Sequence, residues 1–211
     1  MRIIVATNNA GKLEELHRLL PADVELISLA EAGLQSPDEN GNTFVENALI
    51  KARHAAPHAD GAIADDSGLV VDALDGAPGV RSARFAGPEA TDAMNNQELL
   101  RRMAGVPRPD RRGRFVSAAA FVSRSGIERA VEGIVEGVIL TARRGSNGFG
   151  YDPLFELADP AAEEFGGRTL AELDIEEKNA VSHRGRAIRA LVTELRRDGL
   201  LRPVSNGNAQ E

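Results

Sequence analysis

The feature that most constrains how this chain folds is the order of patterns at its amino terminus. Residues 3–6 are uniformly apolar, as in a buried strand, and they run into a polar turn. Four leucines then recur at helical spacing as far as Pro21, namely Leu13, Leu16, Leu19 and Leu20. Residues 24–29 show a second strand pattern. The chain is therefore predicted to begin with a strand, a loop, a helix and another strand.

Similar patterns predict the elements that follow. Thr43 and Glu46 have the spacing of a capping box, at the start of a helix that ends near Pro57. A short strand is expected at residues 62–64, running directly into Asp65 and Asp66, and residues 75–87 are glycine-rich and predicted to be irregular. The later elements are a helix at 91–103, a strand hairpin at 115–122 and 127–140, a loop at 145–150, and a final helix through 187–195.

The domain organisation is expected to be simple. The 211 residues fit one domain or two small lobes at roughly 100–200 residues per domain, and no internal repeat or linker is evident. We expect residues 1–201 to form a single two-lobed domain. Residues 202–211 are polar and rich in Gly, Asn, Gln and Ser, which predicts a disordered tail.

Composition excludes several classes of function. Lys and Arg number 25 against 32 Asp and Glu, and this acidic balance argues against a nucleic-acid polymer as partner, because backbone binding needs a basic surface. No apolar run approaches the ~20 residues that span a bilayer, and no cleavable signal pattern opens the chain. The absence of cysteine excludes disulfides and thiolate ligands. We expect a cytoplasmic protein with a small-molecule ligand.

The polar turn after the first strand is a candidate anion site. Backbone N–H groups at the start of a helix attract anions, and Lys12 adds a positive charge. A P-loop is excluded because Ala6 and Leu13 stand where that motif needs Gly and Ser or Thr. The alternative is an ordinary strand-to-helix connection, since Asn and Gly are turn formers. The turn consists of Thr7, Asn8, Asn9, Ala10, Gly11 and Lys12.

Two adjacent carboxylates, Asp65 and Asp66, are expected at the carboxyl end of an apolar strand. If strand alternation holds, they point to opposite sides, so that one binds metal or activates water while the other orients its surroundings. Glu39 is a candidate oxygen ligand for Mg²⁺, and Lys51 is a candidate phosphate contact. The alternatives are a solvated turn for the aspartates and solvated side chains for Glu39 and Lys51.

Two later segments suit a flat, polar ligand. Phe149 has a glycine on each side, which leaves its ring free to stack on a ligand, although a core anchor fits the pattern as well. Lys178, His183 and Arg184 precede the final apolar helical pattern, where cationic donors and a helix amino terminus suit phosphates or base carbonyls.

Three other motifs carry no comparable signal. His54 and His58 have the spacing of a zinc-protease motif but lack its glutamate, and surface histidines explain them. Ser182 lacks the glycines of a nucleophile elbow. Glu132 and Glu136 fall on one strand face, which an exposed or interface face explains.

Taken together, six ordered segments resemble the inosine triphosphate pyrophosphatase family, whose members hydrolyse non-standard purine nucleoside triphosphates. The resemblance runs from Ile3 to about Leu195, and Asn8 stands where many relatives carry Gly. The segments are TNNAGK at 7–12, TFVENALIKA at 43–52, ADDSGL at 64–69, GAPGVRSARFAG at 76–87, GFGYDPLF at 148–155 and EKNAVSHRGRA at 177–187.

The resemblance implies an α/β fold with a long mixed twisted β-sheet flanked by helices, in two lobes with a nucleotide-binding cleft between them. It also implies a homodimer and Mg²⁺-dependent hydrolysis of ITP, dITP or XTP to the nucleoside monophosphate and pyrophosphate. Two alternatives remain open. One is a pyrophosphatase of the same fold that acts on modified pyrimidine nucleotides, and the other is a nucleotide-binding module without turnover.

The resemblance also assigns roles by matching position. Asp66 resembles the family's general base and metal-site acid, with Asp65 beside it as a second candidate catalytic acid, and Glu39 resembles a second metal-site residue. Phe149 is expected against the purine. Asn9, Lys12 and Lys51 are expected at the phosphates. The other positions that match substrate contacts are Ser67, Phe149, Gly150, Tyr151, Asp152, Lys178, His183 and Arg184. From the interpretation of the turn as an anion site, we also expect Thr7, Asn8, Ala10 and Gly11 at the substrate.

Overall fold

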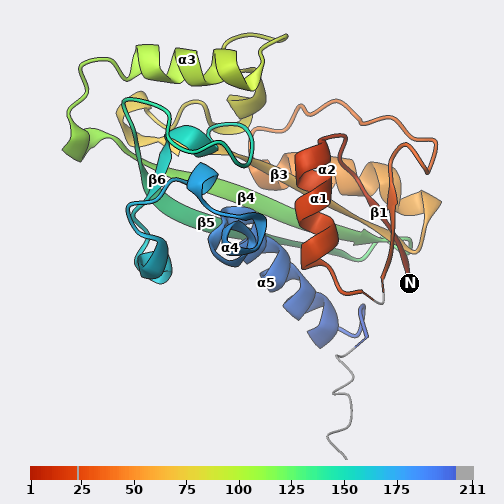
Figure 1. Cartoon of the computed structure of the whole chain (residues 1–211). Helices are drawn as coiled ribbons and strands as arrows, with labels where there is room; N and C mark the ends of the chain where they lie inside the picture. The colour runs from red at the N-terminus through yellow and green to blue at the C-terminus, as the bar shows by residue number, and fades with distance from the viewer. Residues whose placement is uncertain (23, 203–211) are drawn as a thin grey trace, which may run out of the picture.

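A six-stranded mixed β-sheet runs through the computed structural model, which describes residues 1–22 and 24–202 (Figure 1). The strand order is β2-β1-β3-β4-β5-β6. β1 pairs in parallel with β2 and β3, and the remaining pairs are antiparallel. The strands are β1 (Arg2–Val5), β2 (Glu25–Ser28), β3 (Gly61–Val71), β4 (Arg112–Ser123), β5 (Glu128–Ile139) and β6 (Phe155–Leu157).

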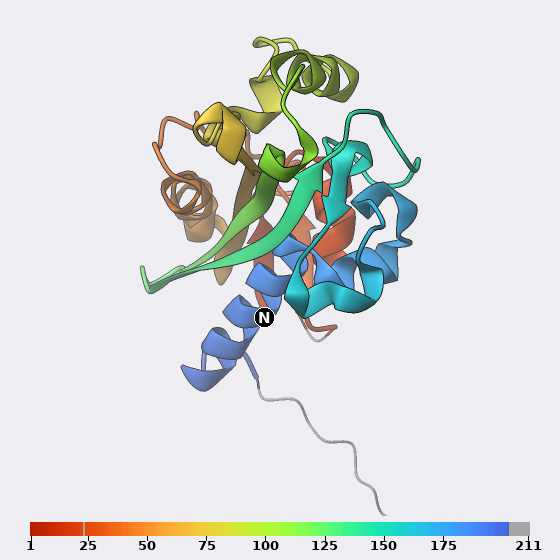
Figure 2. The same ribbon diagram turned by 90° about the vertical axis from the view of Figure 1, so that its left-hand side faces the viewer.

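Helices cover both faces of this sheet, as Figure 2 shows. The five α-helices are α1 (Ala10–Leu19), α2 (Phe44–Ala55), α3 (Asp92–Arg102), α4 (Ile175–Val181) and α5 (His183–Arg197). Alternate residues of β1 face opposite layers: Ile4 packs in the cluster formed with α2, whereas Ile3 and Val5 pack in the cluster formed with α1 and α5. The expected mixed, twisted sheet flanked by helices is therefore confirmed.

A third apolar cluster surrounds the far ends of the long strands. Leu69 of β3, Phe115 of β4 and Ile139 of β5 pack there with Leu99 of α3 and Tyr151. β3, β4 and β5 are 11 or 12 residues long, so they extend from the clusters under α2 and α5 to this third one. Residues in the middle of β3 thus lie between separate apolar clusters.

Most predicted elements are confirmed, including the opening strand, helix and strand, the 115–140 hairpin and the last helix. The Thr43–Glu46 capping box is present. The predicted strand end at Asp65 and Asp66 is wrong, because β3 continues to Val71 and pairs with β4 along its whole length. Part of the 75–87 segment, expected to be irregular, forms a 3-10 helix at Gly79–Arg84.

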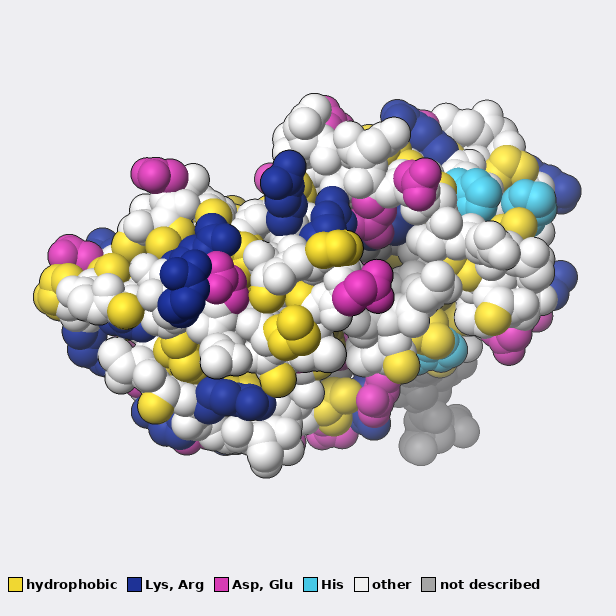
Figure 3. Space-filling model, turned by 90° about the horizontal axis from the view of Figure 1, so that it is seen from above, with side chains coloured by type: hydrophobic (Ala, Val, Ile, Leu, Met, Phe, Trp, Pro, Cys, Tyr) yellow, Lys and Arg dark blue, Asp and Glu magenta, His cyan; other side chains and the backbone are white. Residues whose placement is uncertain are grey.

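Two further observations concern the surface and the terminus. Within the described residues, no helix has the length and apolar character needed to cross a bilayer. On the face seen in Figure 3, Lys and Arg side chains are interspersed with Asp and Glu side chains. Of the predicted disordered tail at 202–211, residues 203–211 lie outside the described residues.

The close approach of β5 and α5 generates the first prediction. A Cβ atom on Gly133 would lie 2.2 Å from the carbonyl oxygen of His183 and 2.5 Å from the amide nitrogen of Ala187. Replacing Gly133 by Ala should therefore push α5 away from the sheet and lower the free energy of unfolding by roughly 1–3 kcal/mol, measured by urea denaturation. Ile127→Ala, at an exposed site just before β5, serves as the control. Equal stability of Gly133→Ala and the unmodified protein would contradict a tight β5–α5 contact.

Candidate active site

A pocket of about 280 Å³ opens above the middle of β3. Segments distant in sequence meet around it: the turn before α1, the helix α2, the 148–152 loop and the junction of α4 and α5. Of the predicted site residues, the following line it: Thr7, Asn8, Asn9, Lys12, Glu39, Lys51, Asp66, Ser67, Phe149, Gly150, Tyr151, Asp152, Lys178, His183 and Arg184. Ala10, Gly11 and Asp65 are not among the lining residues. The structure thus brings the predicted residues together around one pocket.

The turn before α1 is held by local hydrogen bonds. The Asn9 side chain caps the helix by accepting from the Lys12 amide at 3.0 Å, and the Asn9 amide donates to Thr7 Oγ1 at 3.2 Å. Among the described residues, Asp75 is the one non-glycine residue with positive φ, so the backbone at Asn8 does not require Gly. Gly11 allows a close approach, since a Cβ there would lie 2.7 Å from Phe149 Cδ1.

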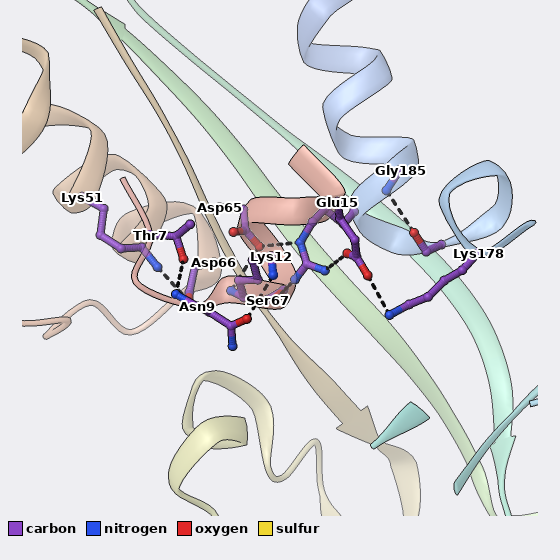
Figure 4. A network of polar contacts seen from close by, with 12 residues as sticks. Thr7, Asn9, Lys12, Glu15, Lys51, Asp65, Asp66, Ser67, Lys178 and Gly185 are labelled. Atoms are coloured by element: carbon purple, nitrogen blue, oxygen red, sulfur yellow. Dashed lines mark hydrogen bonds and ion pairs between the residues drawn. The ribbon is translucent and has the colours of Figure 1, made fainter. Parts of the chain in front are cut away.

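Asp65 and Asp66 point to opposite faces of β3, as strand alternation predicts (Figure 4). Asp65 is fully buried on the α1 and α5 side, where its Oδ2 lies 3.1 Å from Lys12 Nζ and 3.0 Å from Arg184 Nε. Burial alone would raise the pKa of Asp65, but the charges of Arg184 and Lys12 outweigh it and hold that pKa well below its usual value. Asp65 is therefore an ionised partner for two cations.

Asp66 faces α2 and the pocket. Its Oδ2 accepts from Asn47 Nδ2 at 3.1 Å, and its Oδ1 lies 3.3 Å from Lys51 Nζ, which also contacts Glu39 Oε1 at 3.0 Å. Burial raises the pKa of Asp66 above its usual value, although Lys51 and Lys12 oppose this. A carboxylate with a raised pKa that opens onto a pocket is suited to accept a proton.

Glu39 and Asp66 offer oxygen ligands to a divalent cation. Both carboxylates reach the same Lys51 nitrogen, so they lie near one another at the pocket wall. No group of three or more potential metal-ligating side chains occurs within the described part of the chain. Mg²⁺ usually takes one or two carboxylates and completes its shell with water and substrate phosphate. The donor set therefore fits a cation that is shared with a phosphate ligand.

The other end of the pocket combines rings with cations. The half-buried Phe149 ring has Lys178 Nζ at 4.5 Å and the Arg184 guanidinium carbon at 5.5 Å from its centroid. His183 stacks on Phe115 with ring centroids 4.7 Å apart. Burial, with Arg184 and Lys178 nearby, lowers the pKa of His183 well below its usual value, so its ring is neutral at physiological pH. His183 Nδ1 is buried and has no hydrogen-bond partner among the described residues.

Glu15 is a central residue of the buried charge network that sequence reasoning missed. Its carboxylate pairs with Lys178 Nζ at 2.7 Å (Figure 4) and with the Arg184 guanidinium. Lys178 also contacts Asp152 Oδ2 at 2.7 Å. Glu15 lies next to Leu16 on the buried side of α1. An acid beside the apolar stripe of a helix was the available signal.

Asn47 was missed for a similar reason. It lies one helical turn before Lys51 on the buried face of α2, among residues such as Phe44 and Ala48. A polar pair at i and i+4 on an otherwise apolar helix face indicates a buried polar site. The same spacing supports Lys51 as part of the site rather than as a solvated surface residue.

The buried pairs of Glu15 generate a pH-dependent prediction. Burial would raise the pKa of Glu15, but Arg184 and Lys178 outweigh it and lower that pKa below 4.5. A carboxylate with a depressed pKa stabilises the fold above its unfolded-state pKa, and this stability is lost as pH falls through the folded-state pKa. Glu15→Gln should therefore cost about 3–5 kcal/mol of unfolding free energy at neutral pH, and the deficit should shrink in acid.

Urea unfolding over a pH series measures this effect. The control is Glu14→Gln, which alters the exposed neighbouring carboxylate that pairs with Arg18 and should change stability little. A deficit that stays constant from neutral to acid pH would contradict the assignment of Glu15 as an ionised partner.

Comparisons with known proteins agree with this geometry. A sequence profile of the Ham1 family matches residues 3–194. The dITP/XTP pyrophosphatase of Cutibacterium acnes is 51% identical over 197 residues, which cover 90% of this chain and 94% of the relative. The structure of a HAM1 protein from Coxiella burnetii is 42% identical with a TM-score of 0.81, and the match covers 93% of this chain and 99% of that one.

A second solved structure is similar over the same range. It is a nucleoside-triphosphatase or dITP/XTP pyrophosphatase from Mycobacterium abscessus, 47% identical with a TM-score of 0.72, and the match covers 92% of this chain and 99% of that one. The resemblance seen in the six sequence segments is thereby confirmed. The chain belongs to the Ham1 family.

Proposed function

We propose that this protein hydrolyses non-standard purine nucleoside triphosphates, such as ITP, dITP and XTP, to the nucleoside monophosphate and pyrophosphate. Its relatives at 46–51% identity carry the name dITP/XTP pyrophosphatase. The observation that carries the proposal is the composition of one pocket, whose lining combines Asp66, Glu39 and Lys51 with the ring of Phe149 and the guanidinium of Arg184. This arrangement suits a ligand with an anionic end and a flat end.

A divalent cation, which we propose to be Mg²⁺, belongs to this reaction. Glu39 and Asp66 are the residues that would hold it, since both carboxylates line the pocket and lie near one another, each in contact with Lys51 Nζ. When bound, such an ion neutralises charge on phosphate oxygens and lowers the pKa of a coordinated water.

The chain's own residues account for the remaining steps. Lys12 and Lys51 line the pocket, where their charges would neutralise the charge that develops on the leaving pyrophosphate. Asp66 accepts one proton from the attacking water. The oxygen of the resulting hydroxide forms a bond to the α phosphorus. The phosphoanhydride bond between the α and β phosphorus atoms breaks, and its electron pair leaves with pyrophosphate.

Asp65 acts on this site from the face of β3 that is turned away from α2. It does not line the pocket, but it fixes Lys12 and Arg184 from the opposite face of β3. A cation held by a buried carboxylate is positioned before substrate arrives, so less reorganisation is needed during the reaction. We propose that Asp65 orients these two cations while Asp66 performs the proton transfer.

Base preference is proposed to depend on hydrogen-bond donors near His183 and Arg184. A 6-oxo purine presents an acceptor where adenine presents an amine. Donors aimed at that oxygen would lose their partners if adenine were bound, and an unsatisfied buried group costs ~1–3 kcal/mol. The neutral state of His183 suits this role, because a neutral imidazole can donate from one ring nitrogen and accept at the other.

The first test replaces Asp66 by Asn and identifies the products formed from ITP with Mg²⁺. We expect turnover to fall by about 10²- to 10⁴-fold, because the amide cannot take the proton, while substrate binding is retained. Pyrophosphate and the monophosphate should be the products of the unmodified enzyme. Asp72→Asn, at an exposed aspartate just after β3, is the matched control and should keep full activity.

The outcomes of this test separate the alternatives. Release of orthophosphate would contradict the proposed bond, and undiminished turnover of Asp66→Asn would remove Asp66 from proton transfer. A panel of nucleotides distinguishes the other two hypotheses. Preference for a modified pyrimidine would support the related pyrophosphatase activity, and tight binding without hydrolysis would support a non-catalytic module.

The cation generates a separate prediction. Chelation with EDTA should abolish turnover of ITP, and Mg²⁺ should restore it. Glu39→Gln should raise the Mg²⁺ concentration needed for half-maximal rate, because it removes one of two carboxylate ligands. Asp38→Asn changes an exposed neighbour in the same loop and should leave that concentration unchanged. Full activity in EDTA would exclude the proposed metal dependence.

We further propose that the protein acts in the cytoplasm as a homodimer and that residues 1–201 form one two-lobed domain. The homodimer is supported by the family resemblance of the six sequence segments. Sedimentation in solution measures the association state.

A further inference from the structure

α3 has an unusual buried face. Its buried residues are Asn95, Asn96 and Leu99, so two of three are polar amides with 3% and 2% exposure. Burying an amide costs free energy unless hydrogen bonds compensate for it. The hydrogen-bond partners of the Asn95 and Asn96 side chains therefore indicate the role of these two buried amides.

Asn95 holds one wall of the pocket. Its Nδ2 donates to the carbonyl of Ala83 at 3.0 Å, and its Oδ1 accepts from the amide of Ala86 at 2.9 Å. The segment to which Asn95 is hydrogen-bonded contributes Ser82, Ala83 and Arg84 to the pocket lining. Asn95 thus fixes the backbone of the 82–86 segment through both polar atoms of its amide.

Asn96 and Asp92 hold a second segment of the pocket lining, the 148–152 loop. Asn96 Nδ2 donates to the Gly150 carbonyl at 2.7 Å, and the Gly150 amide donates to Asp92 Oδ2 at 2.7 Å. Both backbone polar groups of Gly150, which has a φ of +60°, are therefore bound to the first turns of α3. Gly150 directly follows Phe149, so its position sets where the Phe149 ring stands.

Two further details connect these contacts. The Tyr151 hydroxyl donates to the Ser82 carbonyl at 2.8 Å, which joins the 148–152 loop to the 82–86 segment. Asn96 Oδ1 is buried without a hydrogen-bond partner among the described residues. An apolar side chain would avoid that unsatisfied atom, so the advantage of Asn at this site lies in the bonds that its Nδ2 donates to the carbonyls of Gly150 at 2.7 Å and Asp92 at 2.6 Å.

We propose that Asp92, Asn95 and Asn96 make α3 a positioning element that holds the 82–86 and 148–152 segments of the pocket lining in place around the base of the substrate. The proposal rests on the proposed nucleotide function only for the identity of the ligand. In Figure 1, α3 lies at one extreme of the molecule, and the side chains that contact Asp66, Asn47 and Lys51, come from α2 and not from α3. Loss of its contacts should therefore weaken binding of the base and leave binding of the phosphates intact.

The chain offers a direct probe of this loop. Tyr151 is its single tyrosine and tryptophan is absent, so tyrosine emission reports on the 148–152 loop alone. In the unmodified protein, Tyr151 is buried, and acrylamide should quench its emission poorly. Asn96→Leu keeps the side-chain size but removes the donor to Gly150, and Asp92→Ala removes the acceptor. Both variants should increase quenching.

Two controls separate positioning from general stability. Asp92→Asn retains a carbonyl oxygen that can accept from the Gly150 amide, and it should restore quenching toward that of the unmodified protein. Gln97→Ala alters an exposed residue of the same helix and should change nothing. Unchanged quenching in both Asn96→Leu and Asp92→Ala would overturn the proposal. Because acrylamide quenching needs no turnover, it tests the positioning role of α3 even if the proposed hydrolysis fails.

Ligand binding provides the second measurement. Asn96→Leu should weaken binding of inosine monophosphate by about tenfold, the equivalent of one lost buried hydrogen bond, and should leave binding of pyrophosphate with Mg²⁺ unchanged. An equal loss for both ligands would assign α3 a general structural role and overturn the proposal. Unchanged inosine monophosphate affinity despite increased quenching would overturn it as well. A failure of the unmodified protein to bind or hydrolyse any nucleotide would count against the proposed function alone.

Discussion

The pairing of buried Asp65 with Lys12 and Arg184 is the interaction on which the rest of the site depends. These residues come from β3, α1 and α5, and none of the three charges would be tolerated alone in the interior. Glu15 extends the pairing to Lys178, so that one charge network connects the helices on this face of the sheet. Charges neutralised in this way hold the cations of the pocket in place before a ligand enters.

Strand alternation gives β3 two different functions at consecutive residues. Asp65 faces the layer of α1 and α5, where it pairs with Lys12 and Arg184, whereas Asp66 faces α2, where burial raises its pKa. The same strand thus carries a structural carboxylate and a carboxylate suited to proton transfer. Because β4 pairs with β3 along its whole length, both aspartates are placed by a rigid ladder rather than by a loop.

The two ends of the pocket are built differently. The end near Asp66 rests on long paired strands and on charge pairs, while the end near Phe149 consists of loops that α3 ties together through amide hydrogen bonds. Buried amides specify geometry through directional bonds, at a cost that an apolar helix face would not carry. A site that must distinguish bases gains from walls whose backbone positions are fixed.

The sequence by itself determined the opening strand, helix and strand, the long hairpin, the final helix and the six segments that carry the family resemblance, because apolar periodicity and capping residues are local signals. The sequence pattern predicted Asp65 and Asp66 at the end of a strand, because burying two adjacent acids within a strand costs free energy unless cationic or hydrogen-bonding partners are present. Only the tertiary structure supplied those partners, Lys12 and Arg184 for Asp65 and Asn47 with Lys51 for Asp66. The environment of Glu15, the amide bonds of α3 and the neutral state of His183 were likewise decided by residues far apart in the chain, since burial and charge pairing are properties of the packed molecule.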